Sequence, residues 1–422
     1  MTKEDALAQI VKQYLSSHDF NGFPVRLFPS GSGAKRGKLE SLLSALINEG
    51  AISLNFGDVH PNPHIKALPE HLPEKQIEKL KTADLQHVCA YPTTQILKKV
   101  AEISKYEGKP FTLRLALGEP QLAFESFDLS VLEIYRNDPR YSYTNDDISG
   151  HISVTAPHYE SDVMAKADKV FLETFGFSYD ENRGRAVAVF LRYLADLSPG
   201  HQQIWNAKIV RGNFRLHPDY FRTSVMGNFP EGVSIFTALL EEQKQINDIC
   251  KLMGRPPLFK DVFTGDKRPR NFGFLIRPTL KEFHDFVHLL DKLISENINR
   301  DFFGQDVETS YDEVRADGKV VVREKGSIRL LEEWLRKRFR VDDTATINDI
   351  FLVFKKVREL RRRPAHALDD DKFDQKYIGQ QRELVGQCYD AVRLLRLIFS
   401  SHPKTKNNPV PRWLEEAKVW AY

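Results

Sequence analysis

The chain has few cysteines, no long apolar run and little net charge. Its three cysteines, Cys89, Cys250 and Cys388, are far apart and odd in number, with no paired spacing. We therefore expect free, mostly buried thiols in a reducing compartment and not a disulfide framework. No window of about 18 residues is apolar without charges, which excludes a transmembrane helix. The segment from Met1 to Leu15 has no apolar stretch of signal-peptide type. These features predict a cytoplasmic protein that does not engage a membrane.

The composition is that of a folded protein without a global basic field. Hydrophobic residues make up 41% and charged residues 28% of the 422 positions, which excludes a disordered chain. The net charge is only +3, so a nucleic-acid site has to come from local clustering of Lys and Arg. The length suggests two or three domains.

Periodicity predicts an α+β protein in three parts. Residues 1–158 form a mixed α/β, winged-helix-like domain whose second half is rich in strands, beginning with a strand at Phe111–Leu117. Residues 159–275 form a helical middle domain, with helices at Arg185–Leu197 and Val233–Met253 and a linker at Phe259–Asn271. Residues 276–422 form a helical domain with a C-terminal tail.

Four long helices are predicted in that last domain. Their apolar spacing places them at Thr279–Phe302, Ser327–Phe339, Ile347 to about Arg362, and Phe373–Phe399. A charged hairpin, turning at Asp317-Gly318, separates the first helix from the second.

A short motif ends the third of these helices. Its buried stripe is Ile347, Ile350, Phe351, Phe354 and Val357, and Arg361 follows Phe354 by seven residues. Arg361 therefore returns to the buried face and points toward the bundle or a partner. Pro364 predicts a kink or a restart of the helix, because proline removes a backbone donor and restricts the residue before it. Such a kink, or the pairing of two copies of the helix, brings Arg361 and His366 to a common cleft.

The run Leu360-Arg361-x-x-Pro364-Ala365-His366, late in a helix of a four-helix bundle, resembles the HEPN superfamily. Ribonuclease members of that family share an Arg, four to six intervening residues and a His. The resemblance covers roughly residues 278–402. It implies a HEPN-like four-helix bundle that acts as a homodimer. Arg362 is a departure, since the family commonly has Asn, Asp or His directly after the Arg.

The chemistry implied is metal-independent cleavage of RNA by its own 2′-OH, with no cofactor. His366 is expected to be the acid/base and Arg361 the phosphate clamp, because a planar guanidinium matches phosphate oxygens. The RNA backbone is expected to lie on Lys355, Arg358, Arg362 and Arg363, with Tyr377 stacking on a base. A toxin or an antiviral-defence effector is the role that this activity suggests, with a regulatory partner or ligand at the N-terminal domains.

Three other interpretations remain open. The bundle is also suited to a non-catalytic module that binds nucleic acid or a partner protein, since an Arg-rich helix end is expected from the helix dipole alone. Tyr135, Tyr141 and Tyr143, interleaved with Arg136 and Arg140, suggest either a nucleotide-binding surface or, as we favour, tyrosines at a strand edge. Asp58, His60 and His64 have metal-ligand side chains, but the interleaved prolines argue against a metal site.

Overall fold

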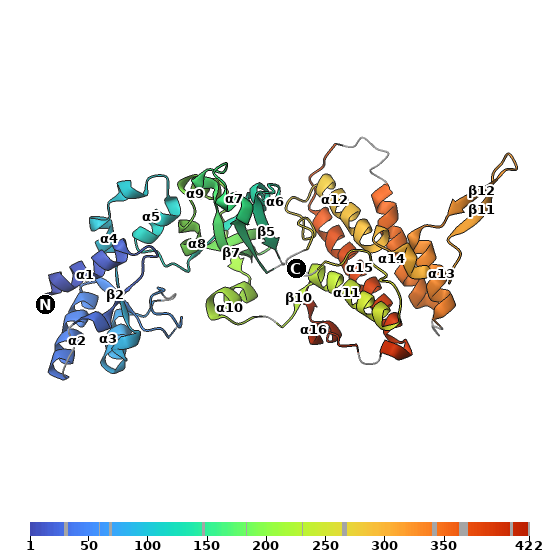
Figure 1. Ribbon diagram of the computed structural model, residues 1–422. Coiled ribbons are helices and arrows are strands. Elements are labelled where there is room, and N and C mark those ends of the chain that lie inside the picture. The colour runs from blue at the N-terminus through green and yellow to red at the C-terminus, as the bar shows by residue number, and fades with distance from the viewer. Residues whose placement is uncertain are drawn as a thin grey trace. The chain divides into compact units, whose positions relative to one another are not determined.

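The computed structural model describes residues 1–422 except 29–32, 59, 67–69, 146–147, 183, 230, 264–267, 340–343, 363–369, 406–407 and 421–422, and except the side chains of 33–35 and 344. The chain forms two compact units (Figure 1). Unit 1 comprises Met1–Tyr143 and Ile148–Phe229, and unit 2 comprises Thr144–Asp147 and Pro230–Tyr422. Helices and antiparallel sheets occur together, so the protein is mixed α+β. Among the described helices, none is both long enough and apolar enough to cross a membrane.

The helices of unit 1 are short. They are α1 Lys3–Ser16, α2 Gly33–Asn48, α3 Pro73–Thr82, α4 Thr94–Val100, α5 Pro110–Ala116, α6 Glu133–Arg136, α7 Ala156–Glu160, α8 Leu191–Ala195, α9 Pro199–Asn206 and α10 Pro218–Met226. The start of α1 is fixed by a capping box, in which Thr2 and Asp5 satisfy each other's backbone N–H groups.

Two sheets complete unit 1. The first has the order β1-β3-β2, with β1 Phe23–Pro24, β2 Ile52–Asn55 and β3 Cys89–Pro92, all antiparallel. The second follows the order β4-β8-β7-β6-β5, with β9 paired to β7. Its strands are β4 Phe124–Phe127, β5 Tyr141–Asn145, β6 Ser149–Val154, β7 Phe171–Tyr179, β8 Arg185–Phe190 and β9 Arg215–Leu216.

Two predictions from periodicity were wrong in this unit. The predicted strand Phe111–Leu117 is helix α5, whose Pro110 occupies the first turn, where a missing N–H costs nothing. The predicted helix Arg185–Leu197 is strand β8 followed by α8. Every residue of β8 after Arg185 is buried, and a fully buried strand and a buried helix have the same apolar pattern. The region 159–275, predicted to be a helical domain, therefore contributes two central strands, β7 and β8.

Long helices dominate unit 2. They are α11 Ile235–Leu252, α12 Leu280–Asp291, α13 Ser327–Arg338, α14 Thr344–Arg362, α15 Lys376–Ser400 and the short α16 Arg412–Glu415. Its strands are β10 Val233–Ser234 parallel to β13 Val419–Trp420, and the hairpin of β11 Ser310–Val314 and β12 Val320–Glu324. The four helices and the hairpin predicted for this part of the chain are confirmed, with α12 shorter than expected.

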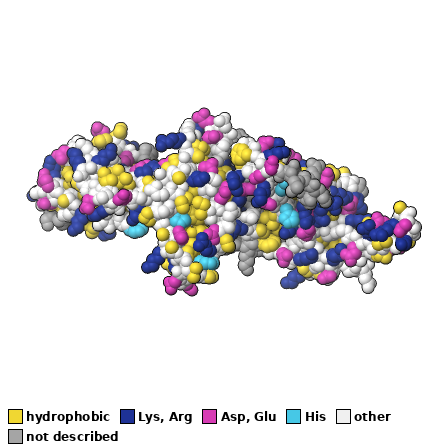
Figure 2. All heavy atoms as spheres, turned by 90° about the horizontal axis from the view of Figure 1, so that it is seen from above, with side chains coloured by type: hydrophobic (Ala, Val, Ile, Leu, Met, Phe, Trp, Pro, Cys, Tyr) yellow, Lys and Arg dark blue, Asp and Glu magenta, His cyan; other side chains and the backbone are white. Residues whose placement is uncertain are grey.

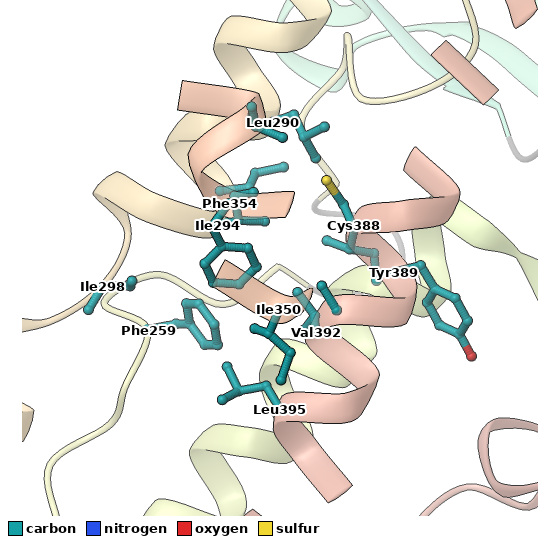
Figure 3. Packing of buried hydrophobic residues seen from close by; sticks show 14 of the residues in the cluster. Phe259, Leu290, Ile294, Ile298, Ile350, Phe354, Cys388, Tyr389, Val392 and Leu395 are labelled. Atoms are coloured by element: carbon teal, nitrogen blue, oxygen red, sulfur yellow. The ribbon is translucent and has the colours of Figure 1, made fainter. Parts of the chain in front are cut away.

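One continuous apolar core joins these helices. In Figure 3, Leu290 and Ile294, from α12 and the turn after it, lie beside Phe354 of α14 and Cys388 of α15. Phe259, predicted to begin a linker, is fully buried in the same core. The side-chain amide of Asn247 in α11 holds the Phe259 backbone in this position. Its oxygen accepts from the N–H of Phe259, and its nitrogen donates to the carbonyl oxygen of Phe259.

A buried ion pair links α11 to α15 inside unit 2. Arg396 donates from Nε and, at 3.4 Å, from Nη2 to the carboxylate of Glu242. The two side chains are 4% and 0% exposed. Burial raises the pKa of the Glu242 carboxyl, and the guanidinium opposes that effect. A fully buried ion pair stabilises the fold little more than apolar residues of similar volume would. Removing one partner is strongly destabilising, because the other charge stays buried without a counterion.

We expect Arg396→Met to lower the free energy of unfolding by about 3 kcal/mol at neutral pH. Without the guanidinium, the pKa of Glu242 rises further in the folded state. The folded variant then holds a proton that the unfolded chain releases, so its stability falls as pH rises from the ordinary glutamate pKa to the raised pKa of the folded state. Urea denaturation at several pH values measures this. The exposed Arg382→Met on α15 is the control, and a loss equal to the control's would contradict the prediction.

Candidate functional site

The C-terminal end of α14 carries the arginine on which the sequence motif depends. The predicted stripe is confirmed: Ile347, Ile350, Phe351, Phe354 and Val357 are all 3% exposed or less. As the helical register predicts, Arg361 continues this stripe and reaches the neighbouring helix α12. Its side chain is 28% exposed, so it lies at the edge of the core.

Asp291 is the last residue of α12, and its carboxylate accepts hydrogen bonds from two guanidinium groups. Arg358 donates from Nε to Oδ1 at 2.9 Å, and Arg361 donates from Nη1 to Oδ2 at 2.7 Å. Asp291 is fully buried. Arg361 also pairs with Glu296, whose side chain is 41% exposed. These four residues, Asp291, Glu296, Arg358 and Arg361, form what we call the Asp291 cluster.

A π-helical turn positions the two carboxylates. The segment Lys292–Glu296 follows α12 directly and adopts i→i+5 backbone geometry. A residue five positions on in a regular α-helix is rotated by about 140°. The wider turn instead lets Asp291 and Glu296 meet the same guanidinium. Single π-turns inside helices are frequently associated with functional sites.

Arg361 is held through one nitrogen of its guanidinium. Both of its ion pairs use Nη1, and Nε and Nη2 make no hydrogen bond with any residue that the structure describes. The hydrogen bonds that Arg361 donates to Asp291 and to Glu296 raise the pKa of its guanidinium, so Arg361 is charged throughout the physiological range. The Nε/Nη2 edge is the fork that binds two oxygens of a carboxylate or phosphate.

The other residues predicted for the site differ in exposure and in the groups that they contact. Lys355 donates to Glu332 at 2.8 Å from an exposed position, and Arg362 lies at the last turn of α14. Tyr377 is only 6% exposed and stacks on Phe283, with ring centroids 5.6 Å apart, so one face of its ring is covered by protein. Arg363, Pro364 and His366 lie outside the described residues.

Basic residues around α13 and α14 are mostly matched by acids. Arg336 and Lys355 share Glu332, at 2.9 Å and 2.8 Å. Lys356 lies 3.5 Å from Glu383, and Arg338 pairs with Asp306. Figure 2 shows Lys and Arg side chains in dark blue near Asp and Glu side chains in magenta along the visible face. The local cluster predicted to hold RNA is thus partly neutralised within the protein.

Sequence reasoning missed Asp291 and Glu296. A signal for Asp291 is present, because it follows Val287 by four residues and so falls on the apolar stripe of α12. A carboxylate on a buried face requires a partner. Its partners, 67 and 70 residues further along the chain, could not be read from local spacing.

The tyrosine-arginine surface in unit 1 is part of the fold. Tyr135, Tyr141 and Tyr143 are 0%, 3% and 8% exposed. The hydroxyl of Tyr135 lies 2.7 Å from Nδ1 of His201 and accepts from Nε1 of Trp205 at 2.9 Å. Tyr141 and Tyr143 lie on β5, at an edge of the larger sheet. The strand-edge interpretation is therefore confirmed for these two, and the burial of all three rings is that of core residues.

Metal-ligand side chains in unit 1 give no assigned site. Asp58 pairs with Lys79 and lies 2.8 Å from Nε2 of His71. His64 instead places Nδ1 3.2 Å from the carbonyl oxygen of Gly22. A different group, His18, Asp19 and Asp196, brings its ligand atoms within 4.8 Å of one another. All three are exposed, and exposed groups of this kind are common without an ion, so we assign no metal to them.

The three buried thiols predicted from the sequence are confirmed. Cys89, Cys250 and Cys388 are free and buried. Burial raises the pKa of Cys89 and of Cys250 to about 12, so neither is a thiolate at neutral pH.

Comparison with known proteins finds no match: no protein-family model, no curated protein and no solved structure is similar to this chain.

Proposed function

We propose that unit 2 is a metal-independent endoribonuclease of HEPN type that cleaves RNA with Arg361 and His366. The observation that supports it best is the orientation of Arg361. A fully buried carboxylate holds Nη1, and Nε and Nη2 of this 28% exposed side chain make no hydrogen bond in the described part of the chain. The motif histidine follows five residues later in the sequence. A guanidinium fixed before substrate arrives costs no reorganisation during the reaction.

The proposed reaction is an internal transfer at phosphorus. The 2′-oxygen of the RNA attacks the adjacent phosphorus, and the bond from phosphorus to the 5′-oxygen of the next nucleotide breaks. His366 takes the proton of the 2′-OH, and the leaving 5′-oxygen receives a proton from the protonated His366 or from water. Arg361 neutralises the charge that grows on the phosphoryl oxygens. The products are a 2′,3′-cyclic phosphate and a 5′-hydroxyl.

The rest of the proposal follows from the motif's resemblance. The C-terminal helices act as a HEPN-like bundle, paired in a homodimer, and the N-terminal region includes a winged-helix-like part. Arg362, Arg363, Arg358 and Lys355 contribute charge along the RNA backbone. A partner or ligand bound by the N-terminal region restrains cleavage in the cell, as a toxin or an antiviral-defence effector requires.

A second function is favoured by one specific observation. Arg361 and Arg358 are balanced by Asp291 and Glu296, and neighbouring cations are paired as well. Paired cations bind phosphate less strongly than free ones. This favours a non-catalytic HEPN-like module that binds a partner protein or nucleic acid.

Incubation of the purified full chain with total RNA in EDTA distinguishes the two functions. The enzyme is expected to fragment the RNA while double-stranded DNA stays intact. A binding module is expected to shift the RNA in a salt-dependent manner and leave its length unchanged. Intact RNA after prolonged incubation at several salt concentrations would argue against the ribonuclease.

A further inference from the structure

Unit 1 contains a cavity of about 340 Å³ that the proposed ribonuclease site does not use. Four separate segments line it: the loop after α1, the loop between β2 and α3, the segment before β4, and α8. The lining residues are Asp19, Asn21, Asn62, His64, Ile65, Gln121 and Arg192. The volume is in the range of small-molecule sites, about 300–1,000 Å³. The lining is unusual for such sites, because six of its seven side chains are polar.

Gln121 fixes the wall of this cavity. It is 3% exposed, and its Nε2 donates to the carbonyl oxygens of Phe20 at 3.0 Å and His64 at 3.3 Å. Its Oε1 accepts from the backbone N–H of Lys66 at 2.9 Å. One buried amide thereby ties the loop after α1 to the loop after β2. The cavity is shaped before a ligand binds, which lowers the entropic cost of binding.

Arg192 brings a positive charge to the cavity. Its guanidinium makes no hydrogen bond and no ion pair within 4 Å with any residue in the described part of the chain; it lies 5.2 Å from the ring of Tyr193, and its charge also acts on the carboxyl of Asp196. The backbone N–H of Arg192 donates to the carbonyl oxygen of Gln121 at 3.1 Å, so the residue is anchored beside the wall. A half-buried guanidinium with unused donors is suited to a phosphate or carboxylate.

The remaining polar groups are suited to hydroxyls. His64 lies with Nδ1 3.2 Å from the carbonyl oxygen of Gly22. That oxygen only accepts, so Nδ1 is the donor in this contact. Asp19 adds a carboxylate, and Asn21 and Asn62 add amides that both donate and accept. Among the described residues that line the cavity none is Phe, Tyr or Trp, so only the His64 ring and the Arg192 guanidinium offer a nucleobase a surface to stack on.

We propose that this cavity binds a phosphorylated sugar, with its phosphate on Arg192 and its hydroxyls on Asp19, Asn21 and Asn62. This site is independent of the ribonuclease activity proposed for unit 2. It gives the N-terminal half of the chain a ligand of defined chemistry.

Isothermal titration calorimetry of the full chain tests the proposal with three probes: ribose 5-phosphate, ribose and inorganic phosphate. Ribose 5-phosphate is expected to bind at one site per chain, at least tenfold more tightly than either of the other two. Arg192→Met is expected to weaken the binding of ribose 5-phosphate by about tenfold or more, because charge-assisted hydrogen bonds to the phosphate are lost. Arg222→Met is the control, since Arg222 is an exposed arginine of unit 1 that pairs with Asp219 at 3.2 Å.

A second variant separates the sugar from the phosphate. The Asp19 side chain is 48% exposed, so Asp19→Asn is expected to fold normally. This variant is expected to bind ribose 5-phosphate more weakly than the wild type and inorganic phosphate with unchanged affinity. Equal affinity for ribose 5-phosphate and phosphate, or no effect of Arg192→Met, would overturn the proposal. Tighter binding of adenosine monophosphate than of ribose 5-phosphate would overturn the assignment to a sugar.

Discussion

Arg361→Ala and His366→Ala are each expected to slow RNA cleavage by about a hundredfold or more. General acid–base catalysis contributes about 10²–10⁴-fold, and loss of one charge-stabilising donor costs about 10²–10³-fold. Initial cleavage rates in EDTA measure both effects. Arg329→Ala is the control, because Arg329 is an exposed arginine of the same unit, paired with Glu333 at 2.9 Å. Cleavage by both variants at the wild-type rate would remove these residues from the reaction.

Arg361→Lys tests the geometry of the clamp beyond its charge. Lysine keeps the positive charge but has no planar Nε/Nη2 edge. We expect this variant to be closer to Arg361→Ala than to the wild type in cleavage rate. Recovery of most of the wild-type rate would mean that charge alone is sufficient at this position.

Asp291→Ala is expected to lower the free energy of unfolding by about 3 kcal/mol. Asp291 is fully buried and holds both Arg358 and Arg361, whose side chains are 27% and 28% exposed. The substitution leaves two partly buried guanidiniums without their shared carboxylate and opens space at the end of α12. Urea denaturation monitored by circular dichroism measures the change.

Asp285→Ala provides the matched control on the same helix. The Asp285 side chain is 66% exposed and lies 3.4 Å from Lys281 one turn away. An exposed pair of this kind contributes about 0–1 kcal/mol. Equal losses for Asp291→Ala and Asp285→Ala would show that the Asp291 cluster contributes no more than a surface pair.

The helices of unit 2 could be predicted because their apolar spacing is regular. The stripe of α14 runs from Ile347 to Val357 in turns of three and four, and each member is buried. The strands of unit 1 were harder to predict from the sequence. In β8 the buried run Ala186–Phe190 has no alternation, and its pairing with β7 decides its structure. Pro110 was the overlooked signal at α5, since proline favours a first helical turn.

The candidate site was predictable only on the helix that carries the motif. Register placed Arg361 on the inward face, and the structure places it against Asp291. The carboxylates come from a different helix and a π-helical turn, which no helical repeat predicts. Tyr377 lies at core spacing on α15, and its ring is packed on Phe283 inside the bundle.

Mass spectrometry of a short oligoribonucleotide cleaved by the full chain in EDTA tests the proposed chemistry most directly. The expected products end in a 2′,3′-cyclic phosphate and a 5′-hydroxyl. An oligonucleotide with 2′-deoxyribose at every position is expected to stay intact, since it lacks the attacking oxygen. Products with a 3′-hydroxyl and a 5′-phosphate, or cleavage of the deoxy oligonucleotide, would contradict attack by the 2′-OH.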